Sequence, residues 1–180
     1  MVDAIELPDP SLVVLIGAAG AGKSSFASRH FAPDAILSSD RFRALVAGDE
    51  ADQRATRAAF GRLHREVARR LAAGQVTVVD ATSVERTSRR ALLALAAAAG
   101  VPATALILDL PAATVLARNA ARPRVVDENV VRHHLARVRA ILAGPVPPIL
   151  LEGFAQVVVL HDPGEVDRVT IRRPASDAGH

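Results

Sequence analysis

The 180-residue sequence contains no cysteine, tryptophan or tyrosine, and only five phenylalanines. Without cysteine the chain can form neither disulfide bonds nor a cysteine-ligated metal site, which is consistent with a cytoplasmic protein. So few aromatic rings leave no obvious stacking platform for a long single-stranded nucleic acid. We therefore expect a cytoplasmic protein without an extended single-strand binding groove.

Long apolar runs are also absent. Half of the residues are hydrophobic, yet no run reaches the roughly 20 residues that span a bilayer. Residues 1–6 lack the basic region and long apolar core of a signal peptide, so we expect neither secretion nor membrane association. The net charge of +3 is mild. Although the arginines cluster, this total alone does not establish a basic patch for a phosphorylated partner.

Short apolar runs alternate with helical patterns along the chain. Strands are predicted at 12–16, 35–38, 75–80, 105–108 and 156–160, and helices at 41–47, 52–73, 85–99, 112–121 and 127–142. Such alternation is typical of a parallel sheet with helices on both faces. We therefore predict a three-layer α/β/α fold of P-loop kinase type, with a five-stranded, mainly parallel sheet. A single domain over residues 1–170 and a disordered tail over 171–180 are expected.

A glycine-rich loop follows the first predicted strand and precedes a helix. Residues 17–24 have the sequence GAAGAGKS, which matches the pattern G-x-x-x-x-G-K-[ST]. In this pattern, backbone N–H groups surround a phosphate, and the start of the helix adds the positive end of its dipole. Lys23, the only lysine in the chain, supplies a compact charge for the β- and γ-phosphates, and the Ser24 hydroxyl ligates Mg²⁺. The loop predicts ATP and Mg²⁺ as cofactors, with the nucleotide bound by Gly17, Ala18, Gly20, Ala21, Gly22, Lys23, Ser24 and Ser25.

Two aspartates follow predicted strands and therefore belong at the same sheet edge as the loop. Asp80 directly follows residues 75–79, where an acid in a P-loop protein holds Mg²⁺ directly or through water. Its alternative role is to cap a turn. Asp40 is placed to accept the proton of a hydroxyl that attacks the γ-phosphate. Its alternative role is to cap the helix that follows.

Arginines complete the candidate site. Arg43 lies about one helical turn after Asp40 and suits a bidentate contact with a substrate phosphate, its alternative being a solvated surface position. Arg118 and Arg122 fall in a segment, about 118–127, where P-loop kinases carry a small helical lid. Their alternative is a basic helix end that complements the helix dipole. The adjacent His133 and His134 point to different sides of a helix and cannot easily share a metal, so they are interpreted as surface or basic-patch residues.

Four motifs together carry a resemblance to a known family: residues 17–24, SSDxxR at 38–43, VVDAT at 78–82 and RNxxR at 118–122. The chain resembles the 5′-hydroxyl kinase module of bacterial polynucleotide kinase-phosphatases. The similarity extends to residues 11–17, 49–53 and the EGF sequence at 152–154, and covers roughly residues 11–170. One departure is Ser83, which stands where the family usually has asparagine.

This resemblance implies a role for each candidate residue. Lys23 and Ser24 would bind the phosphates and Mg²⁺, and Asp40 would be the general base. Arg43 would contact the 3′-phosphate next to the accepting 5′-hydroxyl. Arg118 and Arg122 would be lid arginines on the ATP phosphates, and Gln53 would lie along the nucleic-acid path.

We therefore predict ATP-dependent phosphoryl transfer to the 5′-hydroxyl of DNA or RNA, the activity of a polynucleotide 5′-hydroxyl kinase in nucleic acid repair. The expected partner is a 5′-hydroxyl strand or end. One alternative is a small-molecule P-loop kinase acting on a nucleoside, sugar or antibiotic, and another is a non-catalytic ATP-binding switch. An acid aimed at the γ-phosphate favours a kinase, because a switch does not need one. The oligomeric state and the choice between DNA and RNA stay open.

Overall fold

The computed structural model describes residues 4–46 and 53–173, including their side chains except at 46 and 53–56. Its centre is a five-stranded sheet in the order β3-β4-β2-β5-β6, formed by Ile36–Ser38, Thr77–Asp80, Leu12–Ile16, Ala103–Leu108 and Gln156–Leu160. All four neighbouring pairs are parallel. Every residue of the middle strand β2 is fully buried, as expected for a parallel sheet covered on both faces. The predicted fold class is confirmed.

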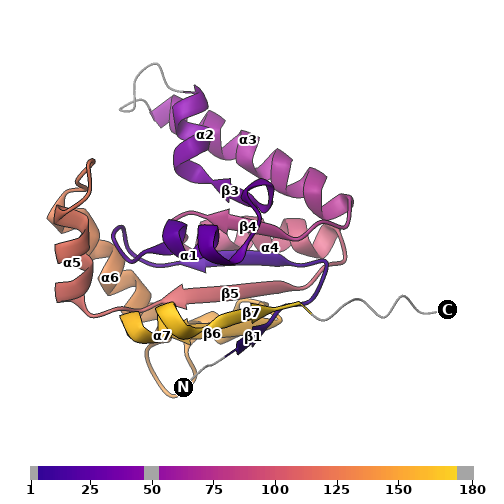
Figure 1. Ribbon diagram of the computed structural model, residues 1–180. Helices are drawn as coiled ribbons and strands as arrows, with labels where there is room; N and C mark the ends of the chain where they lie inside the picture. Colours follow the sequence, from indigo (N-terminus) through magenta and orange to yellow (C-terminus); the bar gives the residue numbers. More distant parts are fainter. Residues whose placement is uncertain (1–3, 47–52, 174–180) are drawn as a thin grey trace.

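Helices cover both faces of this sheet (Figure 1). Side chains of a strand alternate between faces, so β2 contributes Val13 and Leu15 to one core cluster and Leu12, Val14 and Ile16 to the other. The first cluster includes residues of α1 (Lys23–His30) and α7 (Pro163–Arg168), and the second includes residues of α3 (Gln53–Ala72) and α4 (Arg86–Ala98). Helix α6 (Glu128–Leu142) contributes to both clusters. Two cores therefore fix the sheet from both sides.

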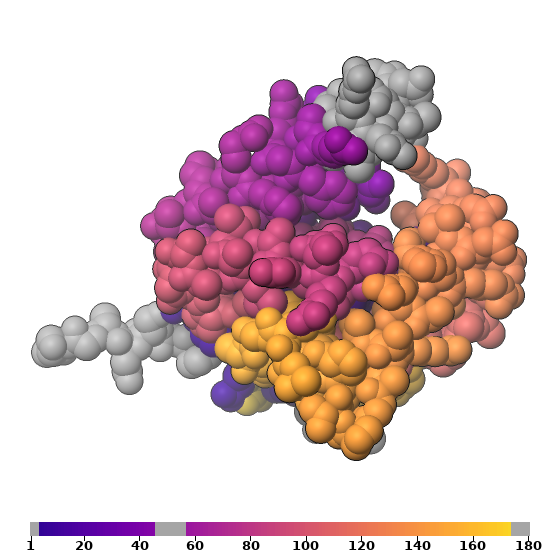
Figure 2. All heavy atoms as spheres, turned by 180° about the vertical axis from the view of Figure 1, so that it is seen from behind, coloured from indigo at the N-terminus to yellow at the C-terminus, as the bar shows by residue number. Residues whose placement is uncertain are grey.

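The carboxyl ends of the strands lead into the elements that surround the candidate site. The glycine-rich loop connects β2 to α1, α2 (Ser39–Val46) follows β3 directly, and α5 (Ala112–Ala120) follows β5. In Figure 2, the purple surface of α2 and α3 and the salmon-to-orange surface of α5 and α6 stand on two sides of a hollow. The fold thus gathers the candidate residues at one sheet edge, as the rule for parallel sheets predicts.

The ends of the described chain form a second, two-stranded sheet that the sequence analysis missed. Strand β1 (Ala4–Glu6) pairs in parallel with β7 (Thr170–Arg172), and the Leu7 N–H donates to the Arg172 carbonyl over 2.9 Å. The expected tail from residue 171 is therefore wrong for Ile171 and Arg172, while residues 174–180 lie outside the described part. Strands this short give no usable periodicity.

Two single turns of 3-10 helix, η1 (Pro33–Ala35) and η2 (Pro148–Leu151), complete the described elements. Each contains proline in its first turn, where the missing N–H costs little. Within the described residues, no helix is both long and apolar enough to cross a membrane.

Candidate active site

The glycine-rich loop packs directly against α5. Gly20 and Gly22 have φ angles of 87° and 95°, a region that glycine enters at little cost. A Cβ atom at Gly20 would lie 2.6 Å from the Val115 carbonyl oxygen of α5, which is too close for any side chain. Glycine at this position therefore serves both the backbone conformation of the loop and the contact with α5.

Lys23, the first residue of α1, is held over the loop and is only 9% exposed. Its Nζ donates hydrogen bonds to the Gly17 and Ala18 carbonyl oxygens, both over 2.9 Å. Burial lowers the pKa of the Lys23 ammonium to about 8; the carboxylate of Asp80 opposes this shift, and the charge of Arg122 adds to it. The pKa of Lys23 thus depends on charges from β4 and from the segment after α5.

Asp80 and Ser24 provide the oxygens that fit a magnesium ion. Asp80 is the last residue of β4 and is 7% exposed. Ser24 lies in the first turn of α1, with an exposed side chain. Both are hard oxygen donors of the kind Mg²⁺ prefers. These two oxygens fit an ion whose other ligands are phosphate oxygens and water.

Asp40 and Arg43 form an ion pair on α2, from Arg43 Nη2 to Asp40 Oδ1. The Asp40 side chain is 68% exposed and that of Arg43 is 43% exposed. Solvent screens such a pair, so it contributes little to stability. The candidate base and the candidate phosphate-binding cation are therefore neighbours, and both remain accessible to an incoming molecule.

Arg118 and Arg122 come from the end of α5 and the turn that follows it. Arg118 Nη1 lies 3.5 Å from the Ala21 carbonyl oxygen of the loop. Between the arginines, Asn119 is 3% exposed and pairs with the backbone of Val126: its Nδ2 donates to the carbonyl over 2.7 Å, and its Oδ1 accepts from the N–H over 3.2 Å. These two bonds close the turn at 120–126, which contains Arg122. The sequence indicated Asn119 only as a member of the RNxxR motif at 118–122 and gave it no role.

A cavity of about 780 Å³ brings these parts together. Among the predicted residues, Gly20, Gly22, Lys23, Ser24, Ser25, Asp40, Arg43, Asp80, Arg118 and Arg122 line it. Gly17, Ala18 and Ala21 do not line it, and their carbonyl oxygens contact Lys23 and Arg118 instead. Gln53 begins α3, but its side chain lies outside the described part, so its predicted role stays a prediction.

A second cavity, of about 500 Å³, adjoins the first. Five residues line both: Ser39, Arg43, Ala81, Thr82 and His134. On the sides of α3 and α4 its lining is mixed: Phe60, Leu63, Ala91 and Leu92 are apolar, and His64, Thr87 and Ser88 are polar. The two cavities therefore meet beside Arg43, at the carboxyl ends of β3 and β4.

His134 corrects the interpretation of the histidine pair as surface residues. It is half-buried and lines both cavities, whereas His133 is exposed with Nε2 3.7 Å from Glu85. Burial lowers the pKa of His134, and the positive charge of Lys23 lowers it further. The signal was present in the sequence, because position 134 lies beside the apolar stripe of α6 formed by Val131, Leu135 and Val138.

In comparisons with known proteins, the chain matches one family model and several solved structures. The model of a family described as an AAA domain (AAA_33) matches residues 12–145. No curated protein matches the sequence significantly. Among solved structures, a chain of the Pnkp1/Rnl/Hen1 RNA repair complex superposes with a TM-score of 0.63 at 20% identity, over 74% of this chain and 45% of that one. The chain thus spans less than half the length of that protein.

Other structural matches are kinases with different descriptions. A putative kinase from Chloroflexus aurantiacus J-10-fl matches with a TM-score of 0.58 at 17% identity, covering 85% of this chain and 88% of that one. A sugar kinase from Janibacter sp. HTCC2649 matches with a TM-score of 0.53 at 21% identity, covering 84% and 85%. At such identities the likeness shows the fold alone, and the acceptor must be argued from the site.

Proposed function

Because the chain belongs to the AAA_33 family of AAA domains and is an ATP-dependent P-loop phosphotransferase, we propose that its acceptor is the 5′-hydroxyl of DNA or RNA. The sequence motifs shared with polynucleotide kinase modules motivate this choice. The similarity in fold to a chain of an RNA repair complex is consistent with it. A cytoplasmic location and a role in nucleic acid repair remain part of this proposal.

The observation that carries the proposal is the Asp40–Arg43 pair at the junction of the two cavities. A carboxylate there can accept the proton of a hydroxyl that approaches the γ-phosphate. A guanidinium beside it can bind a phosphate attached to the same acceptor in bidentate fashion. The 5′-hydroxyl end of a nucleic acid offers both groups on one sugar, whereas a simple sugar offers only the hydroxyl.

On the donor side, the residues around the loop bind and orient ATP. The Lys23 ammonium exchanges the Gly17 and Ala18 carbonyls for phosphate oxygens, and Arg118 and Arg122 add positive charge from the opposite wall. Ser24 and Asp80 would hold Mg²⁺ together with the nucleotide, and the ion would supply positive charge to the phosphates. Positioned charges of this kind supply most of the catalysis in phosphoryl transfer, where the transition state is loose and the protein does little covalent chemistry.

On the acceptor side, the terminal nucleoside occupies the second cavity. The apolar side chains in its lining, among them Phe60 and Leu63, suit a planar base. Its junction with the first cavity supports a position of the sugar near Asp40. The phosphate on the 3′ side draws Arg43 from its pair with Asp40, so the carboxylate is released as the base when the acceptor arrives. The segment at 118–127 closes over the phosphates as a lid, and Gln53 lies along the path of the strand.

The test is transfer of labelled γ-phosphate from ATP to 5′-hydroxyl DNA and RNA oligonucleotides, beside a panel of nucleosides, sugars and aminoglycosides. We expect oligonucleotides to be phosphorylated at the 5′ end with a higher kcat/KM than any small alcohol. Transfer to a small alcohol alone would overturn the proposal in favour of a small-molecule kinase. ATP binding without transfer to any alcohol would favour a binding switch.

A further inference from the structure

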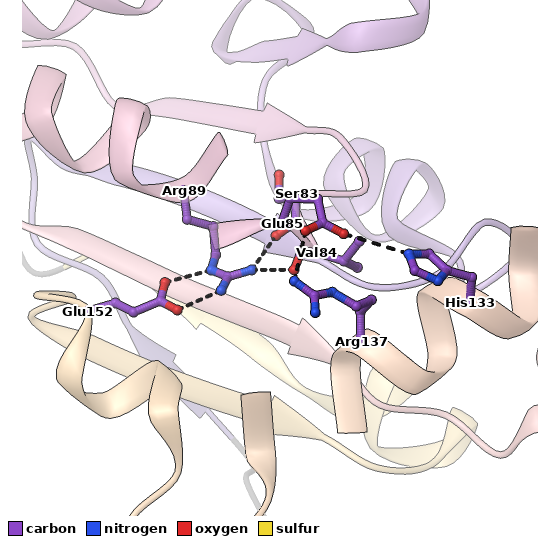
Figure 3. A network of polar contacts seen from close by, with 7 residues as sticks. All are labelled: Ser83, Val84, Glu85, Arg89, His133, Arg137 and Glu152. Atoms are coloured by element: carbon purple, nitrogen blue, oxygen red, sulfur yellow. Dashed lines mark hydrogen bonds and ion pairs between the residues drawn. The ribbon is translucent and has the colours of Figure 1, made fainter. Parts of the chain in front are cut away.

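A buried ion pair lies behind the second cavity and joins two distant segments. Arg89 of α4 is 1% exposed, and the side chain of Glu152, which follows η2, is 5% exposed. Arg89 Nε and Nη2 each donate to one carboxylate oxygen of Glu152 over 2.6 Å, a bidentate contact shown in Figure 3. Glu152 belongs to the EGF sequence at 152–154, which the proposed mechanism does not use.

The remaining nitrogen of the same guanidinium holds a turn near the active site. Arg89 Nη1 donates to the Ser83 carbonyl over 2.9 Å and to the Val84 carbonyl over 2.7 Å. Ser83 has a φ of 49°, in the left-handed region that residues other than glycine enter at a cost and asparagine tolerates better than serine. The 83–85 turn, defined as residues Ser83 to Glu85, thus depends on an external donor for its shape.

The 83–85 turn forms a wall of the second cavity. All three of its residues line that cavity. On the side away from Arg89, the Glu85 carboxylate accepts from Arg137 Nη2 over 2.8 Å and lies 3.7 Å from His133 Nε2 (Figure 3). These partners belong to α6, the helix that carries His134 into the cavities. Arg89 and α6 therefore fix the turn from two sides.

We infer that Arg89, oriented by Glu152, is a positioning residue for the acceptor: it sets the 83–85 turn, and the turn sets where the acceptor lies relative to Asp40. This inference rests on the proposed function in one respect, the assignment of the second cavity to the acceptor. Stability alone gives a weak reason for the pair, because well-packed apolar residues often replace a buried ion pair without loss. A planar fork that binds a carboxylate and two carbonyls at once has no apolar substitute.

Arg70 offers a matched control from the same part of the sheet. It is 7% exposed, and its Nη2 donates to the Val76 carbonyl over 3.4 Å. Val76 precedes β4, whereas Ser83 and Val84 follow it, so the two buried arginines contact opposite ends of one strand. Arg70 lines neither cavity. Its replacement therefore perturbs the fold near β4 without touching the acceptor wall.

The experiment compares wild type, Arg89→Lys, the double variant Arg89→Met/Glu152→Leu, and Arg70→Met. Lysine keeps the charge for Glu152 but cannot reproduce the fork. The double variant removes both charges together, so that neither is left buried without its partner. For both Arg89 variants we expect the KM of the acceptor to rise about tenfold or more, since small displacements at a reacting centre are costly. The KM of ATP should stay close to wild type. The melting temperature of the double variant should fall modestly, because the Ser83 and Val84 carbonyls lose their donor.

Two results would overturn the inference. One is an acceptor KM that stays unchanged in both Arg89 variants. The other is an equal rise of the acceptor KM and the ATP KM in these variants, which is the pattern expected of a general loss of structure. Arg70→Met shows what such a general loss looks like. The KM values are measured with whichever alcohol the wild type phosphorylates best. If that alcohol is not a 5′-hydroxyl nucleotide, the proposed function fails. The role of Arg89 is still decided, because a change in the acceptor KM that exceeds the change in the ATP KM supports it.

Discussion

The donor side and the acceptor side of the cleft are built in different ways. In the proposed function, most of the donor side is one continuous stretch, residues 17–25, to which Asp80, Arg118 and Arg122 are added from other elements. On the acceptor side, the walls come from α2, α3, the 83–85 turn, α4 and α6, elements spread over residues 39–142. Donor chemistry is therefore encoded locally, and acceptor chemistry depends on tertiary packing. Proteins that share this fold can share the donor and differ in the acceptor.

The largest effect is expected where the two sides meet, at Asp40. Asp40→Asn keeps the shape and the capping oxygen but removes the proton acceptor. Transfer should fall by about 10²–10⁴, while ATP affinity and melting temperature remain nearly constant. The matched control is Asp167→Asn, an acid of the first cavity that pairs with Arg29 and should keep most activity. Transfer preserved in Asp40→Asn would contradict the base role, because the asparagine amide cannot accept the proton.

On the donor side, Lys23→Ala tests the charge over the loop. A positioned charge on the transferring group is commonly worth on the order of 10²–10³ in rate, so single-turnover transfer should fall by that amount at saturating ATP. Chelation of divalent cations with EDTA should abolish wild-type transfer, and added Mg²⁺ should restore it. Transfer that survives in EDTA would contradict the assignment of Ser24 and Asp80 to the metal.

The pH dependence of ATP binding is a second test of Lys23 on the donor side. The pKa of Lys23 is lowered to about 8 in the free protein, and bound phosphates favour the protonated form. ATP affinity should therefore fall as pH rises above about 8, approaching roughly tenfold per pH unit. Isothermal titration between pH 7.5 and 9.5 measures this slope. Lys23→Arg should bind less tightly at pH 7.5 but lose the slope, because the guanidinium stays protonated. A slope retained in Lys23→Arg would assign the titration to another group.

A smaller effect is expected at Asn119, which closes the turn that carries Arg122. Asn119→Ala leaves the Val126 N–H and carbonyl without these partners, at a cost of about 1–3 kcal/mol. We expect kcat to fall roughly tenfold while the acceptor KM changes little, because the lid arginines act on the donor. Stopped-flow measurement of transfer separates the two constants. A change confined to the acceptor KM would place this turn on the acceptor side.

The same contrast explains what could be predicted from the sequence. The loop, the order of strands and helices, and the strand-end position of Asp80 follow from local pattern and from the rule that parallel strands end at one edge. Local pattern could not reveal that Arg89 and Glu152 pair, because they are 63 positions apart and neither has a motif partner nearby. Nor could it reveal the left-handed conformation of Ser83, although the asparagine usual at this position in the resembling family suits such a φ.

His134 and the short strands show two further limits. The stripe of α6 indicated that His134 lies beside the core, but no local signal indicated that this part of the helix borders two cavities. Strands β1 and β7 bring together residues from the two ends of the described chain. Their pairing depends on the completed fold, and three-residue segments carry too little pattern to predict it.

The most direct test of the central claim compares a nucleoside 3′-monophosphate with the bare nucleoside as acceptors. If Arg43 binds the phosphate beside the accepting sugar, its loss removes a charge-assisted contact of about 1.5–3 kcal/mol, roughly 10–150-fold in kcat/KM. Wild type should prefer the 3′-monophosphate by that factor, and Arg43→Ala should erase the preference. Arg41→Ala, an exposed arginine of α2 that lines neither cavity, should keep it. Equal use of both acceptors by the wild type would contradict the account.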